Sequence, residues 1–238
     1  MTSPAPPAPS LSHADPLASL RETADDRPFV VAQLGQSLDG RIATPTGESR
    51  WINCEAALDH LHRLRAAVDA VIVGVGTVIA DDPLLTVRRV PGSNPVRVII
   101  DPNGRLPAQA RCLANDGTRR LVIRRNGGIA PPGLESIALD PDGAIFSPHA
   151  IVTALHARGL RRLLLEGGAW TISSFIEAGA VDRLHVLVAP MILGSGKTGL
   201  SLAPIARIDQ ALRPPTRVHV LPDGDVLFDC DLRNGKGG

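Results

Sequence analysis

The most informative stretch of this sequence is Asp69-Ala-Val-Ile-Val-Gly-Val-Gly-Thr-Val-Ile-Ala-Asp-Asp-Pro-Leu-Leu-Thr-Val-Arg88. Its apolar run, 70–73, is typical of a strand buried on both faces, and glycines follow before a short helical segment. The glycines let a ligand approach the backbone, and Thr77 can cap a turn whose free N–H groups favour an anion. Two carboxylates, Asp81 and Asp82, come next. Because Gly-x-Gly often forms a tight turn and Asp-Asp-Pro often ends a helix, the stretch alone is a weak signal of a site.

Length and composition favour one globular domain. The chain has 238 residues, 44% of them hydrophobic, which is enough for a sizeable core. Its 25 Lys and Arg balance 24 Asp and Glu, so no overall field attracts nucleic acid or a lipid surface, and the absence of Tyr removes the usual base-stacking side chains. The three cysteines contain no Cys-x-x-Cys pair, and from the sequence patterns we expect neither a leader nor a membrane span. We therefore expect a cytoplasmic protein that binds neither nucleic acid nor membrane.

The ends of the chain differ from its middle. Residues 1–27 are rich in Pro, Ala, Ser and Asp, and their apolar residues are too sparse to offset the entropy of ordering. We predict a flexible tail there, although Leu17 to Leu20 could form a turn or lie against the domain. A single domain is expected over 28–233, with a short flexible tail over 234–238.

Strand and helix patterns alternate through that domain. This alternation predicts an α/β fold with a mainly parallel central sheet, helices on both faces and a C-terminal antiparallel hairpin. A helix is expected after Asn53, since apolar residues recur at helical spacing to Val68, and another over 149–158. The predicted strands are 29–35, 70–73, 95–101, 119–126, a short one near 136–139, 163–165 and 182–190, and the hairpin strands are 217–221 and 225–232.

Four polar or aromatic residues near the first helix have competing interpretations. His60 and His62 lie two positions apart, so they point to different faces and make poor joint metal ligands; solvent exposure is the favoured interpretation for both. For Arg65, near the helix end, a structural role and anion binding are about equally favoured. Trp51, in a loop before the helix, is as suited to cover a ligand as to fill the core.

A second informative region is Arg161-Arg-Leu-Leu-Leu-Glu-Gly-Gly-Ala-Trp-Thr-Ile-Ser-Ser-Phe-Ile-Glu177. A short apolar strand delivers Glu166 at its carboxyl end, and two glycines then open into an amphipathic helix. Ligands of open parallel sheets bind beyond such strand ends, and a helix start after glycines suits a pyrophosphate. The dinucleotide fingerprint Gly-x-Gly-x-x-Gly is absent. Gly194-Ser-Gly-Lys-Thr198 resembles the end of a phosphate loop but lacks its upstream glycine, so we predict no nucleotide triphosphate site.

Seven segments, taken in chain order, resemble one family. It is the riboflavin-pathway pyrimidine reductase family, which comprises the C-terminal half of bifunctional bacterial RibD proteins and the stand-alone archaeal and fungal reductases. The resemblance covers about 29–196. The segments are Ser37-Leu-Asp-Gly-Arg-Ile-Ala43, Gly47-Glu-Ser-Arg-Trp-Ile52, Leu64-Arg-Ala66, Gly74-Val-Gly-Thr-Val78, Asp81-Asp-Pro-Leu-Leu-Thr-Val-Arg88, Asn94-Pro-Val-Arg-Val-Ile-Ile-Asp101 and Leu163-Leu-Leu-Glu-Gly-Gly168.

This resemblance implies a dihydrofolate-reductase-like fold, a homodimer and NADPH as cofactor. The implied reaction is reduction of 5-amino-6-(5-phosphoribosylamino)uracil to its ribitylamino product. Carried over by motif, the residues at the substrate are Ser49, Arg65, Leu85, Arg88 and Glu166. The residues at NADPH are Gln36, where the family usually has Ala, Gly or Met, together with Trp51, Thr77, Asp81, Gly168, Ala169, Trp170, Thr171, Ile172, Ser173 and Ser174.

The implied chemistry agrees with the residue types. The ribosylamine must open to an imine before hydride reaches its sugar carbon, so the protein mainly has to align two ligands. Arg65 and Arg88 offer fork-shaped donors to the substrate phosphate. Asp81 and Glu166 are the candidate catalytic carboxylates. Arg124 and Arg125, just past a strand end, are candidates for the NADPH 2′-phosphate, with surface charge as the alternative.

The sequence leaves the exact substrate open. The His-x-Glu and Pro-Cys-x-x-Cys motifs of a zinc deaminase are absent, so we expect no metal and a separate deaminase. Reduction could precede deamination, in which case the substrate is the 2,5-diamino pyrimidinone. Two further alternatives are a paralogue that reduces a pterin-like heterocycle and a regulator that binds NADPH or a flavin precursor without turnover.

Overall fold

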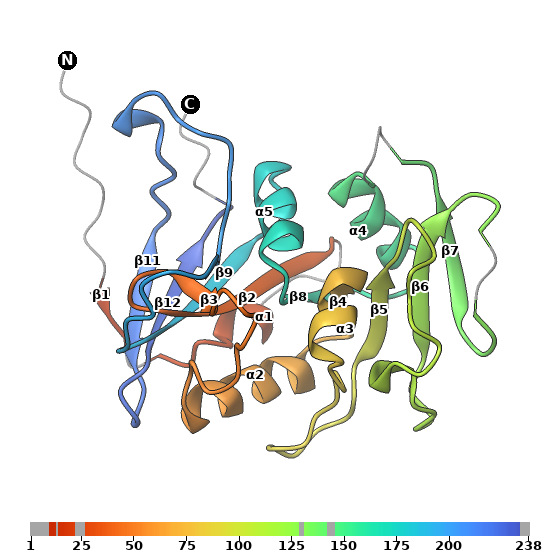
Figure 1. The fold of residues 1–238 in the computed structure, drawn as a ribbon, viewed down its shortest axis with the longest axis horizontal. Helices are drawn as coiled ribbons and strands as arrows, with labels where there is room; N and C mark the ends of the chain where they lie inside the picture. The colour runs from red at the N-terminus through yellow and green to blue at the C-terminus, as the bar shows by residue number, and fades with distance from the viewer. Residues whose placement is uncertain (1–9, 13, 22–26, 129–130, 142–145, 234–238) are drawn as a thin grey trace.

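The computed structural model describes residues 10–12, 14–21, 27–128, 131–141 and 146–233. Within these residues, ten strands form one sheet, in which the strand order is β1-β11-β12-β9-β2-β8-β4-β5-β6-β7 (Figure 1). Every neighbouring pair from β9 to β7 is parallel, whereas β12 pairs antiparallel with both β9 and β11. The predicted sheet and C-terminal hairpin are therefore confirmed. The strands are β1 (Ser10–Leu11), β2 (Phe29–Ser37), β4 (Ala70–Gly74), β5 (Val96–Ile100), β6 (Arg120–Arg125), β7 (Glu135–Leu139), β8 (Arg162–Glu166), β9 (Arg183–Ala189), β11 (Thr216–Val220) and β12 (Val226–Asp231).

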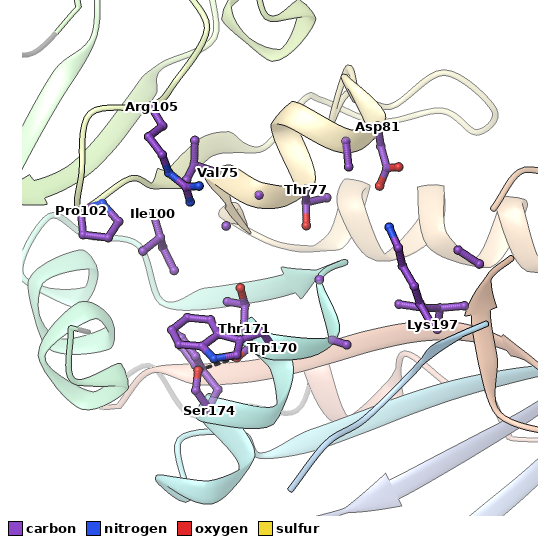
Figure 2. Close-up of a pocket in the computed structure, with 18 of the residues that line it drawn as sticks. Val75, Thr77, Asp81, Ile100, Pro102, Arg105, Trp170, Thr171, Ser174 and Lys197 are labelled. Atoms are coloured by element: carbon purple, nitrogen blue, oxygen red, sulfur yellow. Dashed lines mark hydrogen bonds between the residues drawn. The ribbon is translucent and has the colours of Figure 1, made fainter. Parts of the chain in front are cut away.

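A small second sheet lies at the carboxyl end of the large one. It pairs β3 (Arg41–Ala43) antiparallel with β10 (Lys197–Thr198). The Gly194–Thr198 segment thus ends in a strand beside β3, and it does not lead into a helix as a phosphate loop would. This placement brings Lys197 to the edge where the parallel strands end (Figure 2).

Helices cover both faces of the large sheet (Figure 1). One face packs against α4 (Pro148–His156) and α5 (Ala169–Glu177), and the other against α1 (Ala18–Arg21), α2 (Glu55–Ala67) and α3 (Val75–Asp81). Strand β4 shows why two faces are covered, since its alternate residues belong to different cores: Ala70 and Ile72 to the first, Val71 and Val73 to the second. All four are inaccessible to solvent, as the continuous apolar run predicts.

The start of α2 is held by the turn between β11 and β12. Asp225 Oδ2 accepts the backbone N–H of Cys54 at 2.8 Å, and Asp223 Oδ2 accepts that of Ala56 at 2.7 Å. These carboxylates satisfy N–H groups that have no partner inside the helix, and their negative charge suits its N-terminus. The C-terminal hairpin thereby fixes the helix that carries Arg65.

Part of the expected N-terminal tail is ordered. Ser10 and Leu11 pair with β11, and Leu17, just before α1, and Leu20, within it, lie in the core, each 2% exposed. The described part of this segment therefore differs from a flexible tail and fits the alternative that Leu17 to Leu20 lies against the domain, because two leucines bury enough apolar surface to offset its ordering. The rest of that tail and residues 234–238 lie outside the described residues.

The predicted solvent exposure of His60 and His62 is wrong, since each is only 3% exposed. His60 is buried because β9 covers that side of α2. His60 Nε2 lies 3.0 Å from His185 Nδ1, and the carboxylate of Asp229 lies 3.2 Å from His185 Nε2. Burial lowers the pKa of His60 to about 3, so this imidazole is neutral at physiological pH.

Candidate active site

Two adjoining cavities open beyond the carboxyl ends of the parallel strands. Their volumes are about 630 and 670 Å³, and they share the wall formed by Ile42, Ser49, Thr77, Asp81 and Gly168. Ligands of open α/β sheets bind at this edge. We call them the first and second cavity.

Helices α3 and α5 form opposite walls of the first cavity (Figure 2). They approach closely because both begin at glycines. A Cβ atom at Gly74 would lie 2.7 Å from Thr171 Oγ1, and one at Gly168 would lie 2.7 Å from Thr77 Oγ1. Gly168 also has φ +71°, which a residue with a side chain adopts only with strain. These two glycines thus serve the packing of the helix starts, while a Cβ at Gly76 would meet nothing within 4 Å.

The predicted capping role of Thr77 is wrong. Thr77 lies inside α3, which begins at Val75 and has Gly74 as its N-cap without a side-chain hydrogen bond. The helix starts three residues earlier than a threonine cap requires, because β4 runs directly into it. Thr77 instead faces the wall shared by the two cavities.

Two cations line the first cavity that the sequence did not single out. Arg105 follows β5 in a turn where the buried Asp101 Oδ1 accepts the Arg105 backbone N–H at 2.8 Å. Lys197 extends from β10 toward Asp81 (Figure 2). Partial loss of hydration raises the pKa of Asp81, and the charges of Lys197 and Arg50 oppose that rise. The sequence feature that could have identified Arg105 is its position in a turn after a buried strand, at the edge where ligands bind.

An ion pair that is almost fully enclosed lies at the wall of the second cavity. Arg65 Nε and Nη2 donate to Glu166 Oε1 and Oε2 at 2.7 and 2.5 Å, and the two side chains are 6% and 9% exposed. Arg65 Nη1 donates to the carbonyl of Thr86 at 3.0 Å. Burial alone would lower the pKa of Arg65, but the carboxylate beside it raises that pKa above its ordinary value. The pair fixes Glu166 at the cavity wall.

Strained backbone gathers around the same cavity. Among the described residues, the non-glycine residues with positive φ are Trp51 (71°), Asp82 (40°) and Leu85 (57°). Trp51 and Leu85 line the second cavity, and Asp82 follows Asp81 of its wall. Such conformations cost roughly 1–3 kcal/mol each and occur preferentially at functional sites.

Most of the predicted site residues come together at these cavities. The first is lined by Ser49, Thr77, Asp81, Gly168, Ala169, Trp170, Thr171 and Ser174, and the second by Ser49, Trp51, Thr77, Asp81, Leu85, Arg88, Glu166 and Gly168. Arg65 lines neither cavity; it contacts Glu166, which lines the second.

Other predicted residues lie away from the cavities. Ile172 and Ser173 are buried on the far side of α5, where Ser173 Oγ accepts the backbone N–H of Ser201, because a helix turns successive residues to different sides. Gln36 lies against Gly199. Arg124 Nη2 contacts Asp101 Oδ2 at 3.2 Å, and neither Arg124 nor Arg125 lines the first cavity.

Comparison with known proteins places the chain in a family. The sequence profile of the RibD C-terminal domain matches residues 28–214. The chain belongs to this family. The RibD C-terminal domain seen here is 37% identical over 199 residues to the 2,5-diamino-6-ribosylamino-4(3H)-pyrimidinone 5′-phosphate reductase of Methanothermobacter thermautotrophicus, covering 77% of this chain and 87% of that protein. The resemblance found in the sequence is confirmed.

Longer members of the family contain this domain as one part. The chain is 37% identical over 210 residues to the riboflavin biosynthesis protein RibD of Aquifex aeolicus, and covers 58% of it. A Thermotoga maritima structure described as a deaminase and 5-amino-6-(5-phosphoribosylamino)uracil reductase superposes with a TM-score of 0.73 at 31% identity, with 86% of this chain and 56% of that one covered. The chain therefore spans little more than half of these two relatives. Among the described residues, no helix has the length and apolar character required to cross a bilayer.

Proposed function

We propose that this chain catalyses the NADPH-dependent reduction of a phosphoribosylaminopyrimidine to its ribitylamino product in the riboflavin pathway. The observation that carries the proposal is the pair of cavities that meet at Thr77, Asp81 and Gly168. A hydride donor in one cavity and an acceptor in the other would face each other there. Alignment of two ligands is the main requirement of this reaction, and no protein nucleophile is needed.

The first cavity fits the cofactor. Its volume of about 630 Å³ lies within the roughly 300–1,000 Å³ usual for ligand cavities. NADPH, when bound, supplies the hydride. We assign its contacts to Thr77, Asp81 and the α5 residues of the cavity wall, and its 2′-phosphate to Arg105, which no described side chain pairs with. Ile172 and Ser173 would contribute only by anchoring α5, and Gln36 lies outside the cavity.

The second cavity fits the substrate. Glu166, oriented by Arg65, and Asp81 are placed to hydrogen-bond sugar hydroxyls and pyrimidine N–H groups, or to stabilise the cationic iminium that accepts the hydride. Arg88 provides a cation for the substrate phosphate. Ser49, Leu85 and Trp51 complete the wall.

The identity of the pyrimidine is the finer part of the proposal. We propose the deaminated substrate, 5-amino-6-(5-phosphoribosylamino)uracil, which the Thermotoga relative's description names. The undeaminated 2,5-diamino compound is a second candidate, because the chain covers 87% of the Methanothermobacter reductase named for it. In either case a separate deaminase would act before or after this enzyme.

The decisive experiment measures NADPH oxidation with each of the two pyrimidine phosphates. Turnover of one, with formation of the ribitylamino product, supports the proposal and sets the order of reduction and deamination. Tight NADPH binding without oxidation of NADPH in the presence of either compound would contradict it, and would favour a regulator or a paralogue.

We also propose a cytoplasmic homodimer. Apolar side chains are exposed along the segment between β9 and β11, at Met191, Ile192, Leu202, Ile205, Ile208 and Leu212. A surface of this kind is typical of an interface between subunits. Light scattering after gel filtration should give twice the mass of the chain, and a monomer would refute the dimer.

A further inference from the structure

The charges of the second cavity are out of balance. Arg50, Arg88 and Arg111 line it against Asp81 and Glu166, and the Glu166 carboxylate is already engaged by Arg65. Burial lowers the pKa of Arg88, and the nearby positive charges of Arg65 and Arg111 lower it further. Cations that repel each other at the wall of a cavity favour an anionic ligand.

Arg111 is held in place by its backbone. Asp82 Oδ1 accepts the Arg111 backbone N–H at 2.7 Å, and the neighbours Ala110 and Cys112 are buried at 7% and 0% exposure. Its guanidinium forms no hydrogen bond or ion pair with any residue that the structure describes. The two aspartates at the end of α3 therefore have different roles: Asp81 faces the cavities, and Asp82 anchors the segment that carries Arg111.

Hydrogen bonds also position Arg88, and two of its side-chain N–H donor groups remain without a partner among the described residues. His62 Nδ1 accepts the Arg88 backbone N–H at 2.9 Å, and Thr86 Oγ1 accepts from Arg88 Nη1 at 2.7 Å. The Nε and Nη2 donors of Arg88 form no hydrogen bond within the described residues. Two guanidinium groups with open donors, borne by segments 23 positions apart in the sequence, thus face one cavity.

We propose that Arg111 joins Arg88 in binding the phosphate of the substrate. The assignment rests on the proposed function. A phosphomonoester carries close to two negative charges at neutral pH, which two guanidinium groups would balance, and its oxygens accept paired N–H donors. Arg65 already balances the charge of Glu166 in their enclosed pair, so Arg111 supplies the second cation that has no carboxylate partner among the described residues.

The test compares Arg111→Gln with wild type on the phosphorylated pyrimidine and on the same compound without phosphate. We expect the KM for the phosphorylated compound to rise roughly ten- to a hundred-fold, the loss for one charged hydrogen bond, with kcat and the KM for NADPH little changed. The KM for the dephosphorylated compound should not change, and Arg111→Lys should recover part of the affinity. Arg158→Gln, an exposed arginine outside both cavities, is the control for loss of one charge. An unchanged KM in Arg111→Gln would overturn the proposal.

A second measurement separates this inference from the proposed function. If the wild-type protein oxidises NADPH with neither pyrimidine, the proposed function fails, and binding of ribose 5-phosphate then decides the role of Arg111. Calorimetry should detect binding by wild type and its loss in Arg111→Gln. Equal binding by both proteins, or no binding by either, would refute the anion site.

Discussion

The first cavity is lined largely by glycine backbone and apolar side chains, whereas the wall of the second carries several charged side chains, some of them held by distant partners. In the first, Gly74 and Gly168 let two helix starts approach; Gly74 ends β4, and Gly168 lies two residues after the end of β8. In the second, Arg65 and Glu166 lie 101 positions apart and define the wall together. A cofactor cavity of this kind depends on local backbone geometry, and a substrate cavity of this kind depends on long-range charge pairing.

The largest effect is expected from breaking the long-range pair. Glu166→Gln leaves the Arg65 charge buried without a partner, which should lower the free energy of unfolding by roughly 3–5 kcal/mol and abolish most turnover. Urea unfolding and NADPH oxidation measure the two effects. A double variant, Arg65→Met with Glu166→Leu, should regain stability but not activity. If Glu166→Gln is as stable as wild type, the pair does not define this wall.

A smaller effect should follow from a methyl group at the glycine of the first cavity. Gly168→Ala combines φ +71° with a Cβ only 2.7 Å from Thr77 Oγ1. We expect a loss of about 2–3 kcal/mol in stability, together with weaker NADPH binding. Gly159→Ala is the matched control, because its φ is +79° and its Cβ would meet nothing within 4 Å. Equal losses in both variants would show that strain alone matters and that the close helix approach does not.

Lowering the pH should impair ligand binding in the second cavity before it impairs binding in the first. Burial, followed by the charges of Arg65 and Arg88, lowers the pKa of His62 from 6.5 to about 4. Because the unfolded chain takes up this proton more readily, the stabilisation is fully present above pH 6.5 and is lost as the pH falls toward 4. His62 protonated on Nδ1 also cannot accept the Arg88 N–H.

At about pH 5, the free energy of unfolding should be lower by on the order of 1–2 kcal/mol. The KM for the pyrimidine phosphate should rise more than the KM for NADPH. Unfolding and kinetics measured across this pH range provide the check. His62→Gln can still accept the N–H and does not titrate, so its pH dependence should be flatter. A pH profile identical to wild type would exclude His62 as the cause.

The difference between the cavities also explains what the sequence could predict. The strands, the glycine-bounded helix starts and Thr77, Asp81 and Glu166 are encoded by short contiguous patterns. The capping role of Thr77 was misjudged because the strand-to-helix junction has no spacer. The burial of His60 depends on β9, which lies 125 positions away at His185, and no local pattern reports that contact. Arg105 and Arg111 were missed because Arg105 lies in a turn and Arg111 begins a short 3-10 helix, and only the sheet order brings these segments to the ligand edge.

Two arginines with contrasting surroundings provide the finest test. Asp101 is fully buried and contacts Arg124 Nη2, so Arg124 neutralises that carboxylate, whereas Arg105 gives Asp101 only its backbone N–H. The Arg105 guanidinium reaches the first cavity (Figure 2). Arg105→Gln should therefore raise the KM for NADPH about tenfold, which corresponds to about 1.4 kcal/mol, and leave that for NADH unchanged.

Compared with Arg105→Gln, Arg124→Gln should have the opposite effects. That variant leaves a buried carboxylate without its cation, so it should lower stability while the ratio of the NADPH and NADH KM values stays as in wild type. Steady-state kinetics with both cofactors and urea unfolding of both variants separate the two roles. If Arg124→Gln changes the cofactor ratio and Arg105→Gln does not, the 2′-phosphate lies beyond β6 as the sequence suggested. Cofactor choice would then depend on a strand end and not on the turn after β5.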